Sequence, residues 1–137
     1  MSANLKRVSV LLFILALVAM ECRVANELQA LKSKAAHGDT QAQVELGGRY
    51  LGGKDVPQDY AEAAKWYRKA ADQGHAGAQI KLGSLYETGH GVPRDLGEAQ
   101  RWYERAATTS PPGTDREKAR QASQRVTQPL APASPPP

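Results

Sequence analysis

Residues 65–71 read KWYRKAA, and residues 101–107 read RWYERAA. The two stretches share a tryptophan, a tyrosine and two alanines at an offset of 36 residues. When the comparison is extended without gaps to 38–73 against 74–109, 16 of the 36 positions are identical. A repeat at such a period is typical of proteins that stack one structural unit several times. The fold class therefore follows from what each unit forms.

Each copy predicts two helices separated by a break. In the first copy, Ala42, Leu46 and Tyr50 are four residues apart and share one face of a helix. The break follows at GGKDVP, residues 52–57, or at TGHGVP, residues 88–93. Glycine there permits unusual backbone angles, and proline cannot continue a helix. Each unit is therefore predicted to be helix, turn, helix.

The second helix of each copy carries its own start signal. Asp59 and Asp95 are placed to cap the first turn, and Glu62 and Glu98 are placed to reach back as in a capping box. Alanines along these helices allow a close approach, and aromatic side chains fill the space between helices. The residues that we expect to form this structural repeat signature are Leu46, Gly47, Tyr50, Trp66, Tyr67, Leu82, Gly83, Tyr86, Trp102 and Tyr103.

A single unit of this kind cannot bury its apolar face, so it stacks on its neighbours. We therefore predict an all-α fold, a short α-solenoid of two 36-residue helix–turn–helix repeats with flanking capping helices. The repeats occupy 38–73 and 74–109. A flanking helix over 26–37 precedes them, and a linker with a polar capping helix follows over 110–128.

The order of these residues resembles the SEL-one-like repeat (SLR), a branch of the tetratricopeptide-repeat (TPR) superfamily. Leu-Gly, Val-Pro, Trp-Tyr and Ala-Ala pairs each recur at the 36-residue offset within residues 35–107, which the resemblance covers. It implies a superhelix whose inner helices hold partner proteins on a concave face. Since binding determinants belong where the copies differ on the first helix of each unit, the expected partner-binding residues are Glu45, Arg49, Lys81, Ser84 and Leu85.

Residues 1–25 have the pattern of a secretory signal peptide. Lys6 and Arg7 precede an uncharged, mostly apolar run of 13 residues that ends at Met20. A membrane-spanning helix needs roughly 20 apolar residues, so the run fits a signal better than an anchor. We expect cleavage near Ala25 and no stable membrane span in the mature form.

The exported protein is expected in a bacterial periplasm or outside the cell. The alternative is tethering to the membrane, through an uncleaved signal or through a lipid on Cys22, although the preceding Glu21 does not suit a lipidation motif. At the other end, PLAPASPPP, residues 129–137, predicts a proline-rich disordered tail.

Composition and motifs exclude several classes of function. Without residues 1–25 the chain carries 15 basic and 13 acidic residues, a balance that does not favour nucleic-acid binding. No nucleophile elbow, phosphate-binding glycine loop or His-x-x-x-His pair is present in the sequence. We therefore expect no catalytic residues, no metal site and no cofactor.

The remaining prediction is a protein–protein interaction module, an adaptor, scaffold or regulator. We expect it to be a monomer that binds a protein or peptide of the cell envelope on its concave face. The alternative is a β-lactam-binding or hydrolysing enzyme like the cysteine-rich branch of the family. That branch staples its repeats with paired cysteines, and the repeats of this chain contain none.

Overall fold

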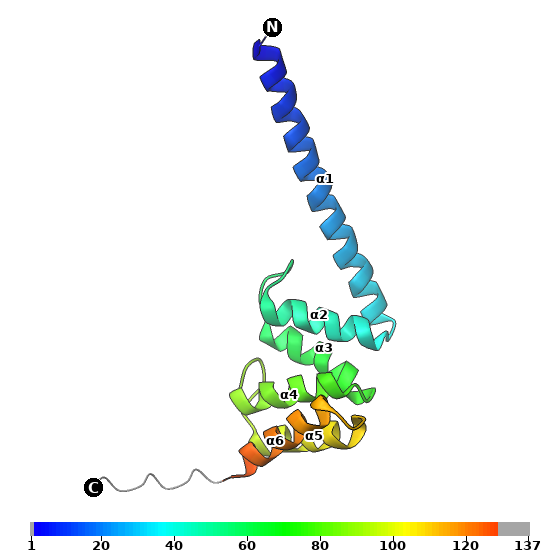
Figure 1. Ribbon diagram of the computed structural model, residues 1–137, viewed down its shortest axis with the longest axis vertical. Helices are drawn as coiled ribbons and strands as arrows, with labels where there is room; N and C mark the ends of the chain where they lie inside the picture. Colours follow the sequence, from blue (N-terminus) through cyan, green and yellow to red (C-terminus); the bar gives the residue numbers. More distant parts are fainter. Residues whose placement is uncertain (1, 129–137) are drawn as a thin grey trace, which may run out of the picture.

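The computed structural model describes residues 2–128, which form six α-helices and no strand (Figure 1). The predicted all-α class is confirmed. The proline-rich tail lies outside the described residues. The helices are α1 (Ser2–Ala36), α2 (Thr40–Gly52), α3 (Tyr60–Asp72), α4 (Ala76–Thr88), α5 (Leu96–Thr109) and α6 (Thr114–Thr127).

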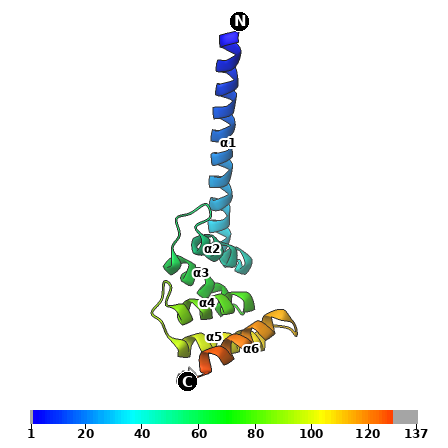
Figure 2. The ribbon, with the colours of Figure 1, turned by 60° about the vertical axis from the view of Figure 1, so that its left-hand side comes forward.

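Each helix packs mainly against the next one in the chain, which gives a stack (Figures 1 and 2). Helices α2 and α3 form the first repeat, and α4 and α5 form the second. Within the main core, alanines of α3 and α4 meet the larger side chains of Tyr67, Leu82, Leu85 and Trp102. The small residues allow close helix packing, so the core is built from few large side chains.

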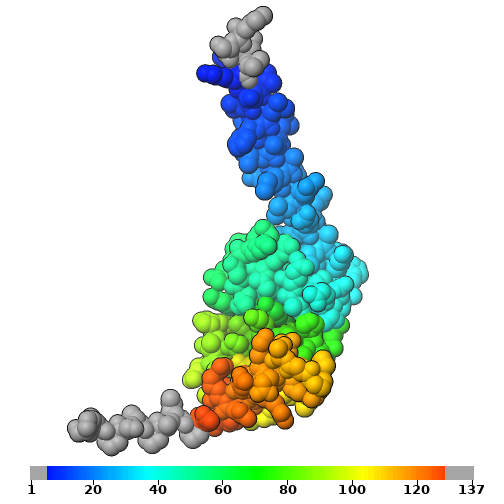
Figure 3. Space-filling view, in the orientation of Figure 1, coloured from blue at the N-terminus to red at the C-terminus, as the bar shows by residue number. Residues whose placement is uncertain are grey.

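Helix α1 runs without a break from the apolar segment into the stack. We expected a separate helix over 26–37, but residues 2–36 form one helix. Its C-terminal end packs on α2 through Leu28, Leu31 and Ala35. The rest projects away from the other helices (Figure 3). Its apolar side chains are exposed, and that of Phe13 is 68% exposed. By length and composition α1 is able to cross a membrane, and a signal sequence gives the same pattern.

Glycine on the first helix of each repeat makes room for a tyrosine of the second. A Cβ atom on Gly47 would lie 3.1 Å from the Tyr67 ring, and one on Gly83 would lie 2.8 Å from the Tyr103 ring. Both pairs follow the 36-residue offset of the sequence. The Leu-Gly pair of the repeat signature is thus explained by the aromatic ring that covers it.

Buried glutamines join consecutive units. The Gln43 side-chain amide donates to the Ala35 carbonyl at 3.0 Å, and Gln79 donates to the Ala71 carbonyl at 3.1 Å. Both bonds therefore satisfy a carbonyl near the end of the preceding helix. The end of α1 thus takes the place of a second helix of a repeat.

Asp59 and Asp95 cap α3 and α5. The Asp59 carboxylate accepts from the backbone amides of Ala61 and Glu62 at 2.9 and 3.0 Å. The Asp95 carboxylate accepts from the Glu98 amide at 3.0 Å.

The predicted capping boxes are wrong in one of their two interactions, the bond from the glutamate side chain back to the backbone amide of the capping aspartate. Glu62 pairs with Lys65, and Glu98 pairs with Arg101. The backbone amides that the glutamates were expected to reach are already used, because the chain turns back onto the preceding helix. They donate to carbonyls at its end, Asp59 to Tyr50 at 2.9 Å and Asp95 to Tyr86 at 3.0 Å.

The two tryptophans occupy different environments. Trp102 is 5% exposed and belongs to the main core. Trp66 is half-buried and packs on the smaller cluster formed with α1, with the Lys69 ammonium 4.1 Å from its ring centre. Trp66 has less cover because the neighbouring unit consists of α1 alone. Trp102 is therefore a core residue, whereas Trp66 is only partly covered.

Candidate functional site

Two of the expected partner-binding residues on α2 are engaged within the chain. Arg49 forms an ion pair with Glu45 at 2.8 Å, one helical turn away, and a second with Asp55 at 3.0 Å. The Arg49 side chain is only 16% exposed, whereas that of Glu45 is 50% exposed. Glu45 therefore stays accessible, but Arg49 has its charge neutralised by two carboxylates.

Leu85 is not a surface residue. It is 5% exposed and lies in the main core, because α4 packs between α3 and α5 and turns this side chain inward. The expectation that Leu85 contacts a partner is therefore wrong. The patch predicted from α2 and α4 loses its apolar member.

Lys81 and Ser84 line a groove of about 300 Å³ that we call the α4–α6 groove. Ile80, from the same helix, and Tyr103, from α5, contribute to it as well. Lys81 is exposed, Ser84 and Ile80 are partly buried, and Tyr103 is buried. Exposed charge thus stands beside a partly apolar floor.

The opposite wall of the α4–α6 groove comes from α6, through Lys118, Gln121, Ala122 and Arg125. From the sequence we expected only a polar capping role for this helix. Residues of α6 nevertheless repeat those of α4 at an offset of 37: Lys81 corresponds to Lys118, Leu82 to Ala119 and Leu85 to Ala122. Ala119 and Ala122 are buried, as their counterparts are.

A hydrogen bond supports this correspondence. The Arg116 guanidinium donates to the Ala107 carbonyl at 3.0 Å. In the preceding units the equivalent bonds run from Gln43 to the Ala35 carbonyl and from Gln79 to the Ala71 carbonyl. Helix α6 therefore takes the place of the first helix of a third repeat. The groove lies between two consecutive helices of that kind. These α6 residues can be found from the sequence by aligning α6 with α4 and allowing one inserted residue in the loop before α6.

Tyr103 and Arg125, two residues that line the α4–α6 groove, belong to a hydrogen-bond network around Glu87. Its carboxylate accepts from Arg125 at 2.8 and 3.0 Å and from the Tyr103 hydroxyl at 2.7 Å. Burial by itself raises the pKa of Glu87, but the bonds from Arg125 and Tyr103 outweigh it and the pKa lies below its ordinary value. Burial, together with the Glu87 carboxylate, raises the pKa of Tyr103, so its hydroxyl remains a donor.

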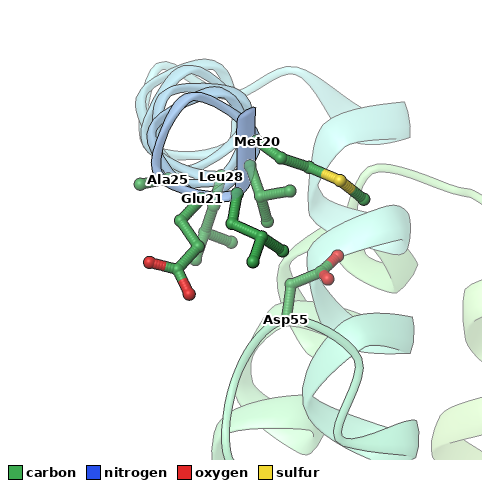
Figure 4. A pocket seen from close by; sticks show the side chains of 7 residues that line it. Met20, Glu21, Ala25, Leu28 and Asp55 are labelled. Carbon is green, nitrogen blue, oxygen red and sulfur yellow. The ribbon is translucent and has the colours of Figure 1, made fainter. Parts of the chain in front are cut away.

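A second hollow, of about 420 Å³, lies between α1 and the loop after α2 (Figure 4). Met20, Glu21, Ala25 and Leu28 line it from α1, and Asp55 lines it from the loop. Most of its lining belongs to the segment that we expect to be removed on export. In the described part of the chain, no three His, Cys, Asp or Glu side chains gather as a metal site would require.

Comparison with protein families identifies the repeat. The model of the Sel1 repeat matches residues 40–75 and 76–108. The chain belongs to the Sel1 repeat family. The resemblance to the SEL-one-like repeats is thereby confirmed, and proteins with Sel1 repeats generally serve as protein–protein interaction modules.

Among curated proteins, the chain is similar to the secretory immunoglobulin A-binding protein EsiB of Escherichia coli O6:H1 (strain CFT073). The two are 40% identical over 55 residues, which is 40% of this chain and 11% of EsiB. The chain thus spans about a tenth of the length of this relative.

Solved structures with Sel1-like repeats share the fold. The SLR-fold protective antigen c5321 of uropathogenic Escherichia coli is 43% identical, with a TM-score of 0.57, over 59% of this chain and 17% of its own. A Sel1 repeat protein from Oxalobacter formigenes is 41% identical, with a TM-score of 0.59, over 61% and 34%. Helicobacter pylori cysteine rich protein B is 26% identical, with a TM-score of 0.62, over 69% and 67%.

Proposed function

We propose that this Sel1-repeat chain is an exported, non-enzymatic module that binds a protein or peptide of the cell envelope. The binding surface is the exposed side of the first helices of the repeats, α2 and α4, together with α6. Stacked units of this kind form an extended surface suited to another polypeptide.

The α4–α6 groove is the observation that carries the proposal. It places exposed Lys81 and Lys118 beside the partly apolar floor of Ile80 and Ala122, on helices fixed by the core. Charge at the rim and apolar area at the centre are the usual composition of a protein interface. Glu45 extends the surface along α2.

The relatives support a protein partner and an envelope location. EsiB is named for binding secretory immunoglobulin A, and c5321 is described as a protective antigen. The partner of EsiB is not assigned to this chain, which spans 11% of that protein. The apolar start of α1 supports export, because a positively charged end followed by a short apolar run directs secretion.

We do not propose the alternative, a β-lactam-binding enzyme. The cysteine-rich relative from Helicobacter pylori shares the fold, but Cys22 is the single cysteine of this chain and lies outside the repeats. The repeats therefore lack the disulfides that characterise that branch.

Capture from envelope extract tests the proposed function. The processed chain, purified from envelope, is used as bait, and bound proteins are quantified by mass spectrometry. We expect Lys81→Glu to reduce capture of a partner several-fold, because it reverses a charge on the binding surface. Lys65→Glu, at an exposed lysine on α3, serves as the matched control. Capture of no specific protein, or equal loss with both variants, would contradict the proposal.

A further inference from the structure

The α4–α6 groove has an uneven balance of charge. Lys81, Lys118 and Arg125 line it, and no aspartate or glutamate is among its lining residues. Arg125 is neutralised by Glu87, and Lys118 lies 3.6 Å from exposed Asp115. Among the described residues, no carboxylate pairs with Lys81. The groove therefore presents Lys81 without a paired carboxylate and Lys118 with one exposed carboxylate partner, Asp115.

The floor of the groove is partly apolar. Ala122 and Tyr103 belong to the small core cluster between α5 and α6, and Ile80 packs against it. The amide of Gln121 and the hydroxyl of Ser84 are able to bond a passing main chain. A ligand that fits needs negative charge, aliphatic area and peptide-like polar groups together.

We propose that the α4–α6 groove binds an extended acidic segment of a partner polypeptide. This rests on the proposed function and names the chemistry of its partner. The carboxylates of two glutamates lie against Lys81 and Lys118, and their methylene stems cover Ile80 and Ala122.

The spacing of the two lysines suits such a segment. They occupy corresponding positions on consecutive first helices, and packed helices lie about 8–10 Å apart. In an extended chain, side chains two residues apart point to the same side and are separated by about 7 Å. The lysine side chains are flexible enough to bridge the difference between these two distances. A Glu-x-Glu arrangement therefore reaches both ammonium groups.

Fluorescence anisotropy with a defined probe tests the inference. The probe is a labelled peptide of about ten residues that alternates glutamate with serine, and the matched peptide has glutamine in place of each glutamate. We expect the glutamine peptide to bind at least about tenfold more weakly, equivalent to about 1.4 kcal/mol. Glutamine keeps the methylene stem, so this comparison isolates the charge.

Variants of the processed chain locate the binding. Lys81→Glu combined with Lys118→Glu should weaken binding of the glutamate peptide at least about tenfold. Arg120 lies on α6, like Lys118, but outside the groove lining. Arg120→Glu should therefore change the affinity for the glutamate peptide less than about twofold. All three substituted side chains belong to exposed residues, so circular dichroism and melting curves should stay near those of the unsubstituted chain.

Three results would overturn the inference. One is equal binding of the glutamate and glutamine peptides, and another is equal weakening by Arg120→Glu and by the double variant. The third is binding of a single-stranded DNA of equal charge as tightly as the peptide, which would reassign the groove to anions in general. Loss of partner capture with Lys81→Glu, combined with equal binding of the glutamate and glutamine peptides, would leave the proposed function standing and reject only the acidic segment.

Discussion

At the scale of single residues, two interacting positions of the repeat differ together between the two units. In the first unit Arg49 pairs with Asp55, which adopts a positive φ of 62°. The corresponding residues of the second unit are Leu85 and Gly91, and a Cβ on Gly91 would lie 2.2 Å from the Tyr60 backbone. The second loop packs tightly on the preceding repeat, so its ion pair is replaced by a buried leucine and a glycine.

This exchange explains the wrong expectation for Leu85. Sequence differences between the copies indicate exposure only when both copies have the same neighbours. The first loop faces α1, whereas the second faces Tyr60, whose ring stacks on His90 with centroids 4.9 Å apart. Gly47 and Gly83, which are identical in the two copies, lie against tyrosines that are identical too.

The Gly83–Tyr103 contact gives a test at this scale. Gly83→Ala should lower the free energy of unfolding by about 1–3 kcal/mol, because the added methyl group would overlap the tyrosine ring 2.8 Å away. Gly52→Ala is the control, since nothing lies within 4 Å of its Cβ position. Thermal unfolding measures both. A melting temperature for Gly83→Ala equal to that of Gly52→Ala would contradict the packing described.

At the scale of helices, α6 was only partly predictable. The apolar spacing of Ala119, Ala122 and Val126 indicated a helix with one buried face, and α6 buries the two alanines. It also takes the place of the first helix of a third repeat. There Arg116 donates to the carbonyl of the preceding helix, as a glutamine does in the preceding units. A change of residue type combined with a one-residue shift of register hides that equivalence from the sequence.

The Glu87 network predicts a pH dependence for the docking of α6. The folded-state pKa of Glu87 lies below its ordinary value of 4.5, so its stabilising contribution is present above that value. It is lost as the pH falls through the lower, folded-state pKa. At pH 7, Glu87→Gln should cost about 1 kcal/mol, a modest figure because the Arg125 side chain is 65% exposed.

Melting curves of both proteins between pH 7 and pH 3 check this prediction. The difference between the original chain and Glu87→Gln should shrink as the pH falls below about 4.5, where the carboxylate takes up a proton. A difference that stays constant over this range would show that the Glu87 charge does not hold α6.

At the scale of the whole molecule, the stack requires cover at both ends. Helix α6 covers Ala99 and Tyr103 of α5, and the end of α1 covers Leu46 of α2. The helical repeat fold followed from the period of the sequence. The unbroken course of α1 did not, because apolar composition marked residues 1–25 as a separate segment.

Truncation tests the contribution of α6 as a cover. A chain ending at Thr109 should lose at least about 2 kcal/mol of stability and tend to associate, because the removal exposes the Tyr103 side of α5. A chain ending at Gln128 keeps α6 and is the matched control. Equal melting temperatures for the two truncated chains would contradict the capping role.

Site-specific photocrosslinking in living cells tests most directly the central claim that the first helices bind a protein partner. A photoreactive side chain is placed at Lys81 in the α4–α6 groove and, separately, at Arg101, which is 75% exposed on α5. Our account predicts a discrete crosslinked protein from position 81 and none from position 101. Crosslinks from position 101 alone, or the same products from both positions, would contradict it.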